Sequence, residues 1–358
     1  RCGARTFSCT NRENRGMREA IRTLEPGYFA VVMATGIVST AMHAHRLEFI
    51  SAVLLWIAGI AYAVLVAGNL ARIMLFGADF RADLADPQRS FTTFTFVAGT
   101  NVLGTRLLAD GHVGPAVWLL GVGFVAWLVL GYLIPWTAVL GHPEGPTLSR
   151  VNGTWFLAVV ASQSVAVLAA ALQPLLGSWH RELALVAVVC WSVGGFLYAA
   201  AAILVAVRML LYPVSAEELT PPYWIAMGAT AITVLAGARM VQMVDTPLIA
   251  ATRGLIAGVA VLFFGFGTWL IPALIAAGFW RHVIQRVPLN YTTALWSMVF
   301  PLGMYGVAGH FLGLADDVPA LVVFGDAEGW IALGAWTATF VAMVGHLLAS
   351  VFSGRTAK

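Results

Sequence analysis

The sequence carries little charge for its length, and this scarcity excludes most classes of soluble protein. Only 10% of its 358 residues are Asp, Glu, Lys or Arg, whereas 60% are hydrophobic and the mean hydropathy is +0.84. A soluble domain carries roughly 25% charged residues, so this chain lacks the polar surface that a water-soluble fold requires. The net charge is +3 without any run of Lys or Arg, which argues against nucleic acid as a partner.

Cysteine and the common catalytic motifs are also scarce. The three cysteines lie far apart, at Cys2, Cys9 and Cys190, and no Cys or His spacing suits a metal or a disulfide framework. The chain has no Walker A sequence, GxSxG elbow or HExxH motif, and no paired carboxylates within its apolar runs. We therefore expect no metal, no cofactor, no ATP-driven pumping and no enzymatic activity.

Long apolar runs are abundant instead, and each is long enough to cross a hydrocarbon core of about 30 Å as a helix. They predict an all-α membrane protein with ten transmembrane helices. The expected spans are 27–45, 49–75, 91–108, 113–141, 152–172, 183–212, 221–241, 253–280, 291–313 and 329–353. We expect this domain to cover residues 24–353, between an N-terminal tail at 1–23 and a C-terminal tail at 354–358. Residues 1–16, ahead of Met17, are expected to be an extension outside the fold.

The charged residues set the expected orientation. All 17 acidic residues fall in the tails and in the breaks between the expected spans. With the N-terminus inside, 15 of the 20 basic residues lie in cytoplasmic tails and loops, as the positive-inside rule requires. The sequence thus predicts a multi-pass protein of the cell (plasma or inner) membrane with both termini cytoplasmic.

The odd-numbered spans repeat at a near-constant period. They open at Gly27, Phe91, Asn152, Pro221 and Tyr291, so successive openings are 64, 61, 69 and 70 residues apart. Each opens with one or more aromatic residues, and small residues follow a turn or two later. This pattern predicts five helical hairpins, in quasi-fivefold arrangement around a central axis.

Polar residues are concentrated in the odd spans. Ser, Thr, Asn and Gln number 19 in the 102 residues of the odd spans but 9 in the 139 residues of the even spans. Unsatisfied polar groups are costly in lipid. We therefore expect the odd helices to form an inner ring around a hydrated pore and the even helices to face lipid and neighbouring subunits.

Hydroxyls, amides and glycines of the inner helices are the candidate pore wall. Such groups offer weak hydrogen bonds to a passing ion without holding it by strong charge. The alternative is that small and hydroxylated residues serve as ordinary contacts between membrane helices. The candidates are Thr35, Gly36, Ser39, Gly99, Thr100, Asn101, Gly104, Ser162, Gln163, Gly228, Thr230, Ser297 and Gly303.

The ninth span holds a candidate gate, because Phe300 directly precedes the helix-interior Pro301. Proline removes a backbone donor and crowds the carbonyl of Ser297, so we expect a kink at this point. A kink can push Phe300 into the centre of the ring, where an apolar side chain would obstruct a water-filled path. The alternative is a packed phenylalanine beside an ordinary proline.

Basic residues near the C-terminal ends of four odd spans are candidates for a pore mouth that attracts anions. They are His43, Arg106, Arg239 and His310, all on the expected non-cytoplasmic side. A partial ring of cationic groups between low-dielectric walls concentrates anions and repels cations. Helix capping and snorkelling explain each residue equally well when it is taken singly.

Two segments resemble a known family. Pro26-Gly27-Tyr28-Phe29-Ala30 with Met33-Ala34-Thr35-Gly36, and Trp296-Ser297-Met298-Val299-Phe300-Pro301-Leu302, are similar to the tellurite-resistance/dicarboxylate transporter family, over about residues 24–353. That family includes bacterial tellurite-resistance proteins, fungal malate permeases, sulfite efflux proteins and plant slow anion channels. The resemblance implies five hairpins around a pore in each subunit, a homotrimer, and a phenylalanine plug, which by its Phe-Pro context is Phe300.

These observations together predict an anion channel or facilitator that passes small inorganic or organic anions through a pore in each subunit, gated by Phe300. One alternative is a proton-coupled carrier of malate-like C4-dicarboxylates or an exporter of sulfite or tellurite. A second is a membrane sensor whose central path never conducts, which a dry, tightly packed ring interior would favour. The sequence does not choose among the candidate anions.

Overall fold

A computed structural model describes residues 17–141 and 147–356, and these residues are mostly helical, with no β-strand among them. Nine of the helices in these ranges are long and apolar enough to cross a membrane. The chain is an all-α membrane protein, as its sequence predicts. Residues 1–16 of the expected N-terminal tail, with Cys2 and Cys9, lie outside the described residues.

Ten long helices alternate between two environments. The first, third, fifth, seventh and ninth of these helices are what we call the inner helices, namely α2 (Ala30–Ala44), α5 (Phe94–Ala109), α7 (Leu157–Leu172), α9 (Ile225–Val241) and α11 (Trp296–Ala315). The other five are the outer helices, namely α3 (Glu48–Leu75), α6 (Val113–Ile134), α8 (His180–Leu211), α10 (Pro247–Phe279) and α12 (Pro319–Thr356). A short helix, α4 (Gly77–Ala85), joins the first hairpin to the second.

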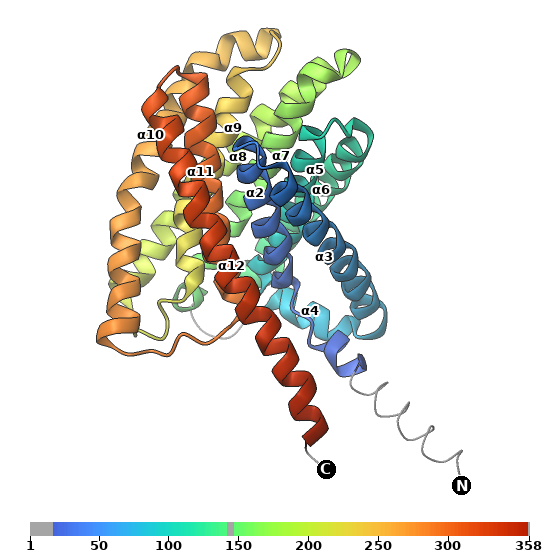
Figure 1. Ribbon diagram of the computed structural model, residues 1–358, viewed down its shortest axis with the longest axis vertical. Helices are drawn as coiled ribbons and strands as arrows, with labels where there is room; N and C mark the ends of the chain where they lie inside the picture. The colour runs from blue at the N-terminus through green and yellow to red at the C-terminus, as the bar shows by residue number, and fades with distance from the viewer. Residues whose placement is uncertain (1–16, 142–146, 357–358) are drawn as a thin grey trace.

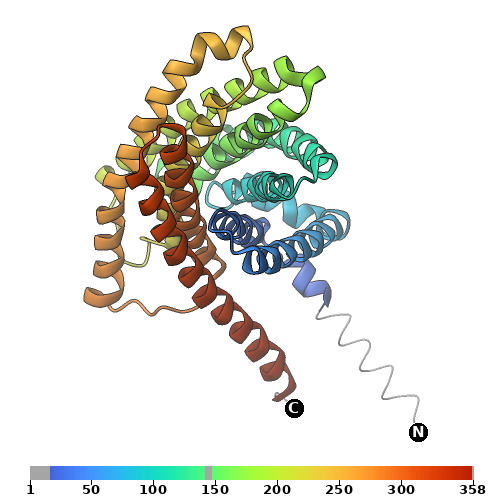
Figure 2. The same cartoon turned by 45° about the horizontal axis from the view of Figure 1, so that its top comes forward.

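The inner helices pack side by side in a closed circuit. Contacts run from α2 to α5, α7, α9 and α11 in turn, and α11 packs back against α2. Each inner helix also packs against the outer helix that follows it in sequence, so the chain forms five hairpins (Figures 1 and 2). We call this circuit the ring. The ring agrees with the arrangement expected from the repeat, while its quasi-fivefold symmetry stays a prediction.

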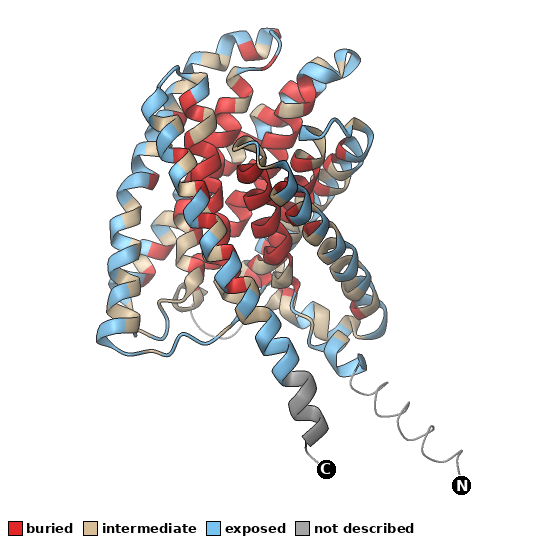
Figure 3. Ribbon diagram, viewed as in Figure 1, coloured by how far each residue is buried: buried red, intermediate tan, exposed pale blue. Residues whose placement is uncertain are grey.

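Burial separates the inner helices from the outer ones (Figure 3). Nearly every residue of α7 is buried, whereas the outer helices expose large apolar side chains such as Trp56, Phe196 and Trp269. Exposed aromatic and aliphatic groups are stable on a helix that faces lipid. The outer helices therefore provide the lipid-facing surface, and the inner helices form the core.

Helix α5 is the least apolar of the inner helices and is not among the nine that qualify as spans by hydropathy. Its sequence from Phe94 to Ala109 contains three threonines, one asparagine and one arginine. It nevertheless lies in the ring, between α2 and α7. The total of ten transmembrane helices remains a prediction.

A 3₁₀ turn precedes every inner helix, and this is the structural form of the aromatic openings seen in sequence. The turns are η1 (Pro26–Phe29), η2 (Ser90–Thr93), η5 (Gly153–Phe156), η8 (Pro221–Trp224) and η10 (Thr293–Leu295). Neighbouring turns touch one another from η1 through η2, η5 and η8 to η10. All five inner helices therefore begin at one end of the ring, here called its N-terminal end, and finish at its C-terminal end. The first described residues and the end of α12 lie on the same side of the molecule (Figure 1).

The last hairpin is packed through glycines. A Cβ atom added at Gly325 of α12 would lie 2.6 Å from the carbonyl oxygen of Gly306 in α11 and 3.0 Å from the carbonyl carbon of Gly309. One added at Gly313 would lie 2.7 Å from the backbone nitrogen of Val322. Small residues at such positions let two membrane helices approach closely, so α11 and α12 are held backbone to backbone.

The acidic residues are not all outside the helices, and this expectation was wrong. Helix α12 begins at Pro319 rather than near residue 329, so Asp326 and Glu328 lie within its N-terminal turns. The helix is longer because the segment from Pro319 to residue 329 packs closely against α11, despite the helix-interior Gly325. At its other end α12 continues to Thr356, so the expected C-terminal tail at 354–358 begins inside the helix.

We expect Gly153→Ala to destabilise the chain, because its Cβ would lie 2.4 Å from the backbone of Pro222 in the neighbouring turn. Overpacking of this kind costs about 1–3 kcal/mol, so the thermal midpoint in detergent should fall by several degrees. Gly177→Ala is the matched control, since nothing lies within 4 Å of its added Cβ. Equal midpoints for the two variants would show that η5 and η8 do not need this close approach.

Candidate functional site: the axis of the ring

A small cavity lies on the axis of the ring, and all five inner helices line it. Its volume is about 20 Å³, enough for roughly one water molecule. We call it the axial cavity. Its lining residues are Ile37, Thr40, Val102, Thr105, Ser164, Val167, Ile232, Leu235, Arg239, Met304, Val307 and Phe311.

The hydroxyl groups in the axial cavity donate their hydrogens to backbone carbonyls of their own helices. Thr40 and Thr105 each donate to the carbonyl four residues earlier, at 3.0 and 2.9 Å, and Ser164 donates to the carbonyl three residues earlier at 2.7 Å. These oxygens therefore present lone pairs to the cavity and not donors. Lone pairs do not attract an anion, so the hydroxyls are not the source of anion affinity.

Arg239 is the one charged residue among the described residues that line the axial cavity. It lies in the last turn of α9, and its guanidinium carbon is 3.9 Å from the centroid of the Phe311 ring. A cation over an aromatic face is stabilised by about 0.5–2 kcal/mol. The positive charge of this cavity therefore comes from a single guanidinium.

Phe300 continues the cavity-lining face of α11 toward the N-terminal end of the ring. Met304, Val307 and Phe311 line the cavity, and Phe300 precedes Met304 by four residues, one helical turn. Its side chain is completely buried. Pro301 packs against Gly228 of α9, where an added Cβ would lie 2.8 Å from the proline ring. The helical register thus places Phe300 on the cavity-lining face of α11, one turn from the cavity toward the N-terminal end of the ring.

Several polar side chains that we expected in the pore wall point instead toward the outer helices. The Thr35 hydroxyl accepts a 2.9 Å hydrogen bond from the Trp336 indole of α12. Thr100 bonds to the Tyr62 hydroxyl of α3 at 3.0 Å. Thr230 lies against α10, where a Cβ added at Gly267 would be 2.4 Å from its hydroxyl.

Ser162 and Gln163, the neighbouring polar residues of α7, also point toward an outer helix. Ser162 donates to the Cys190 carbonyl at 2.9 Å, and the Gln163 amide donates to the Trp191 carbonyl at 3.1 Å, both in α8. Asn101 of α5 differs, because its amide donates to Ser164 between neighbouring inner helices at 3.1 Å. None of the three lines the axial cavity. In a membrane, contact with a partner helix satisfies a polar group as well as water does.

The glycines expected in the wall are contact points between inner helices. An added Cβ at each would meet a neighbouring inner helix or its leading turn, as the nearest atoms show: Val102 for Gly36, Phe29 and Val32 for Gly99, Leu168 for Gly104, Pro301 for Gly228, and Ile37 for Gly303. These positions therefore set how tightly the ring closes. Ser297 is buried three residues before Phe300, and its role in the wall stays a prediction.

Arg106 does not form part of a mouth open to solvent. Its guanidinium is 1% exposed and bonds to Asp110 at 2.6 Å and to the hydroxyls of Ser39 and Ser51 at 2.7–3.0 Å. Ser51 belongs to α3, so the arginine joins α2, α3 and α5 away from the axial cavity. The same cluster explains why Ser39 faces outward.

The two histidines of the expected mouth each contact a carboxylate. His43 bonds to Glu48 at 2.9 Å and His310 bonds to Asp326 at 2.8 Å. In the part of the chain that the structure describes, Arg239 is therefore the member of the four that has no carboxylate partner. The expected ring of four cationic groups is reduced to one unpaired cation at the axis.

Thr40, Thr105 and Ser164 lie in the polar segments of the inner spans, but they are not among the candidate residues for the pore wall. The sequence did contain a signal for the direction of the cavity. Ile232, Leu235 and Arg239 of α9 are spaced three and four residues apart, as residues on one helix face are, and this face of α9 is the one that lines the axial cavity. The composition of a whole span carries no such directional information.

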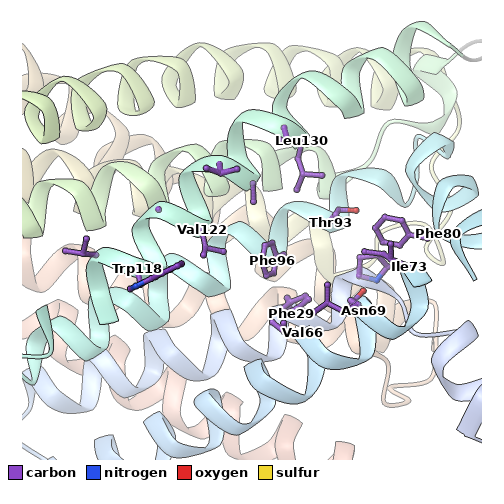
Figure 4. Close-up of a pocket in the computed structure, with 17 residues that line it drawn as sticks. Phe29, Val66, Asn69, Ile73, Phe80, Thr93, Phe96, Trp118, Val122 and Leu130 are labelled. Carbon is purple, nitrogen blue, oxygen red and sulfur yellow. The ribbon is translucent and has the colours of Figure 1, made fainter. Parts of the chain in front are cut away.

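A larger hollow of about 780 Å³ lies on the outer surface between α3 and α6 (Figure 4). The rings of Phe29 and Phe96 lie in its floor, and Asn69 and Thr93 are among its few polar residues. An apolar groove with no cation offers nothing to an anion.

The sequence profile of the voltage-dependent anion channel family matches residues 23–344, which include the first four hairpins and most of the fifth. This chain belongs to that family. Family membership makes it an anion channel or transporter.

Individual relatives agree with this assignment. An uncharacterized membrane protein of Mycobacterium tuberculosis is 58% identical over 162 residues, covering 45% of this chain and 82% of the relative. Two uncharacterized transporters of Methanocaldococcus jannaschii align over nearly their whole lengths. One is 24% identical over 332 residues, covering 90% of this chain and 93% of the relative, and the other is 23% identical over 351 residues, covering 96% and 99%.

We expect Arg106→Gln to act on stability and not on anion preference. The substitution removes the ion pair to Asp110 and the hydrogen bonds that the buried guanidinium donates to Ser39 and Ser51. A hydrogen bond to a charged group contributes about 1.5–3 kcal/mol, so thermal unfolding in detergent should occur at a clearly lower temperature. Arg181→Gln, at an exposed position of α8 on the same end of the ring, should leave the midpoint unchanged. A stable Arg106→Gln protein with altered reversal potential would place this arginine in the permeation path after all.

Proposed function

We propose that this chain is an anion channel or facilitator whose path runs along the axis of the ring and is closed by Phe300. The observation that supports this most directly is the register of α11. Phe300 lies on the same helix face as the three α11 residues of the axial cavity, one turn toward the N-terminal end. An apolar ring on that axis is a barrier to a hydrated ion.

The distribution of charge supports an anion as the permeating species. Within their described bounds the five inner helices contain no Asp or Glu, whereas the axial cavity holds the Arg239 guanidinium. A partly buried cation beside a low-dielectric path favours anions and opposes cations. The proposed substrates are small inorganic or organic anions.

A second candidate function is a proton-coupled carrier of C4-dicarboxylates, or an exporter of sulfite or tellurite. One observation favours coupling. His310 bonds to the Asp326 carboxylate at 2.8 Å, and the His45 ring lies 3.9 Å from the same carboxylate. The cluster brings two imidazoles and one carboxylate together where α2, α11 and α12 meet, and a proton-coupled carrier needs groups of this kind within its helical bundle.

A third candidate function is a membrane sensor that does not conduct ions. The tightly packed interior of the ring fits this function as well as a closed channel, because both would be packed in the same way. The two differ in their response to removal of the Phe300 ring, since only the channel has a path behind it. We further propose that three subunits assemble in the cell membrane with both termini cytoplasmic, as the family resemblance and the basic residues predict.

We expect Phe300→Ala to raise anion conductance several-fold, because removing the ring opens the narrowest part of the axis. The measurement is planar-bilayer recording of purified protein in chloride and in nitrate. Phe156→Ala is the matched control, since Phe156 is also buried but packs against Tyr198 of α8, with ring centroids 5.3 Å apart. It should lower stability without raising current.

Two outcomes would contradict the channel. A well-folded Phe300→Ala protein with no current in any anion would favour the sensor. Saturable flux that depends on an imposed pH gradient, without unitary currents, would favour the coupled carrier. In the second case, Asp326→Asn should abolish the dependence on the gradient.

A further inference from the structure

We infer that Arg239 and the axial cavity form a binding site for a single small monovalent anion. This inference deepens the proposed function and rests on it only for the route by which the anion arrives. It begins from the guanidinium of Arg239, whose Nε atom is buried and has no hydrogen-bond partner among the described residues.

The other arginines show that this fold normally neutralises a buried guanidinium. Each arginine that is buried in the described chain has a carboxylate within 3.1 Å, in the pairs Arg72–Asp83, Arg106–Asp110 and Arg208–Glu218. Arg239 is partly buried and has no such pair. Among the described residues its charge is offset by the Phe311 ring and by the C-terminal end of α9, and neither accepts a hydrogen bond from its Nε atom.

These two contacts leave the buried Nε atom without an acceptor, and an unpaired buried donor is destabilising. None of the cavity hydroxyls is within hydrogen-bonding distance of this atom, and the cavity holds roughly one water molecule. An anion beside the guanidinium supplies the missing acceptor. It does so with a charge-assisted hydrogen bond, the strong kind.

The cavity also limits the kind of anion. One guanidinium neutralises one negative charge, and the remaining walls are aliphatic, aromatic or lined by hydroxyl lone pairs. A C4-dicarboxylate needs a second cation and several times the volume. Chloride and nitrate carry one charge, are compact and lose their hydration water at a lower cost than a divalent anion does. The geometry therefore favours monovalent inorganic anions over malate-like substrates.

The site is tested by binding and not by flux. Thermal unfolding of the purified full chain in detergent is followed during titration with sodium chloride, sodium nitrate and disodium succinate, with sodium gluconate holding ionic strength constant. A ligand that binds the folded state raises the midpoint with its concentration. We expect chloride and nitrate to stabilise the wild-type chain saturably, and succinate to do so at least roughly tenfold more weakly.

Variants at the guanidinium sharpen the test. Arg239→Gln should weaken chloride binding by roughly tenfold or more, because a hydrogen bond to a charged group contributes about 1.5–3 kcal/mol. Arg239→Met, which removes the unpaired charge and keeps much of the side-chain length, should lose the chloride dependence and unfold in gluconate at a temperature no lower than wild type. Arg181→Gln is the control and should titrate like the wild type.

The outcomes separate the site from the proposed function. Wild-type midpoints that do not respond to chloride, or an equal response in Arg239→Met, would overturn the site. Tighter binding of succinate than of chloride would overturn the proposed anion class. Chloride binding that depends on Arg239, in a chain whose Phe300→Ala variant carries no current, would uphold the site and overturn the channel.

Discussion

Every polar group on an inner helix must find its partner inside the protein, because the hydrocarbon around the outer helices supplies none. This constraint organises the fold. Thr35 bonds to α12, Thr100 to α3, and Ser162 and Gln163 to α8. Hydroxyls and amides thus fasten each of these inner helices to an outer one, and the polar composition of the inner helices is used mainly for cohesion between helices. The axis itself is left largely apolar.

In the channel that we propose, an apolar axis gives selectivity among ions a different origin from that in a polar pore. A wall of polar groups would treat many ions alike, whereas a nearly apolar wall with one unpaired guanidinium concentrates the electrostatic preference in a single place. Arg106 shows that position near a mouth is not enough for this role, since Asp110 and two serines satisfy its charge. What distinguishes Arg239 is the absence of a carboxylate neighbour in the described chain.

The architecture could be predicted from the sequence because its signals are local and additive. Apolar runs of sufficient length indicated helices, the period of 61–70 residues indicated hairpins, and the difference in polar content separated inner from outer helices. The direction of each side chain could not be predicted, since it depends on which helix lies opposite. Composition cannot show that Gln163 faces Trp191, or that Ser51, from another helix, bonds to Arg106. The start of α12 was also missed, because Asp326 and Glu328 indicate a loop unless their packing against α11 is known.

The glycine contacts between α11 and α12 have a consequence for dynamics. Backbones that touch at Gly306, Gly309 and Gly325 cannot slide or separate without losing contacts along the whole hairpin, and such collective displacements take microseconds to milliseconds. Rotation of one aromatic side chain about χ1 leaves those contacts intact and is intrinsically faster. In the channel that we propose, a hairpin packed this closely confines any fast opening to the rotamer of Phe300.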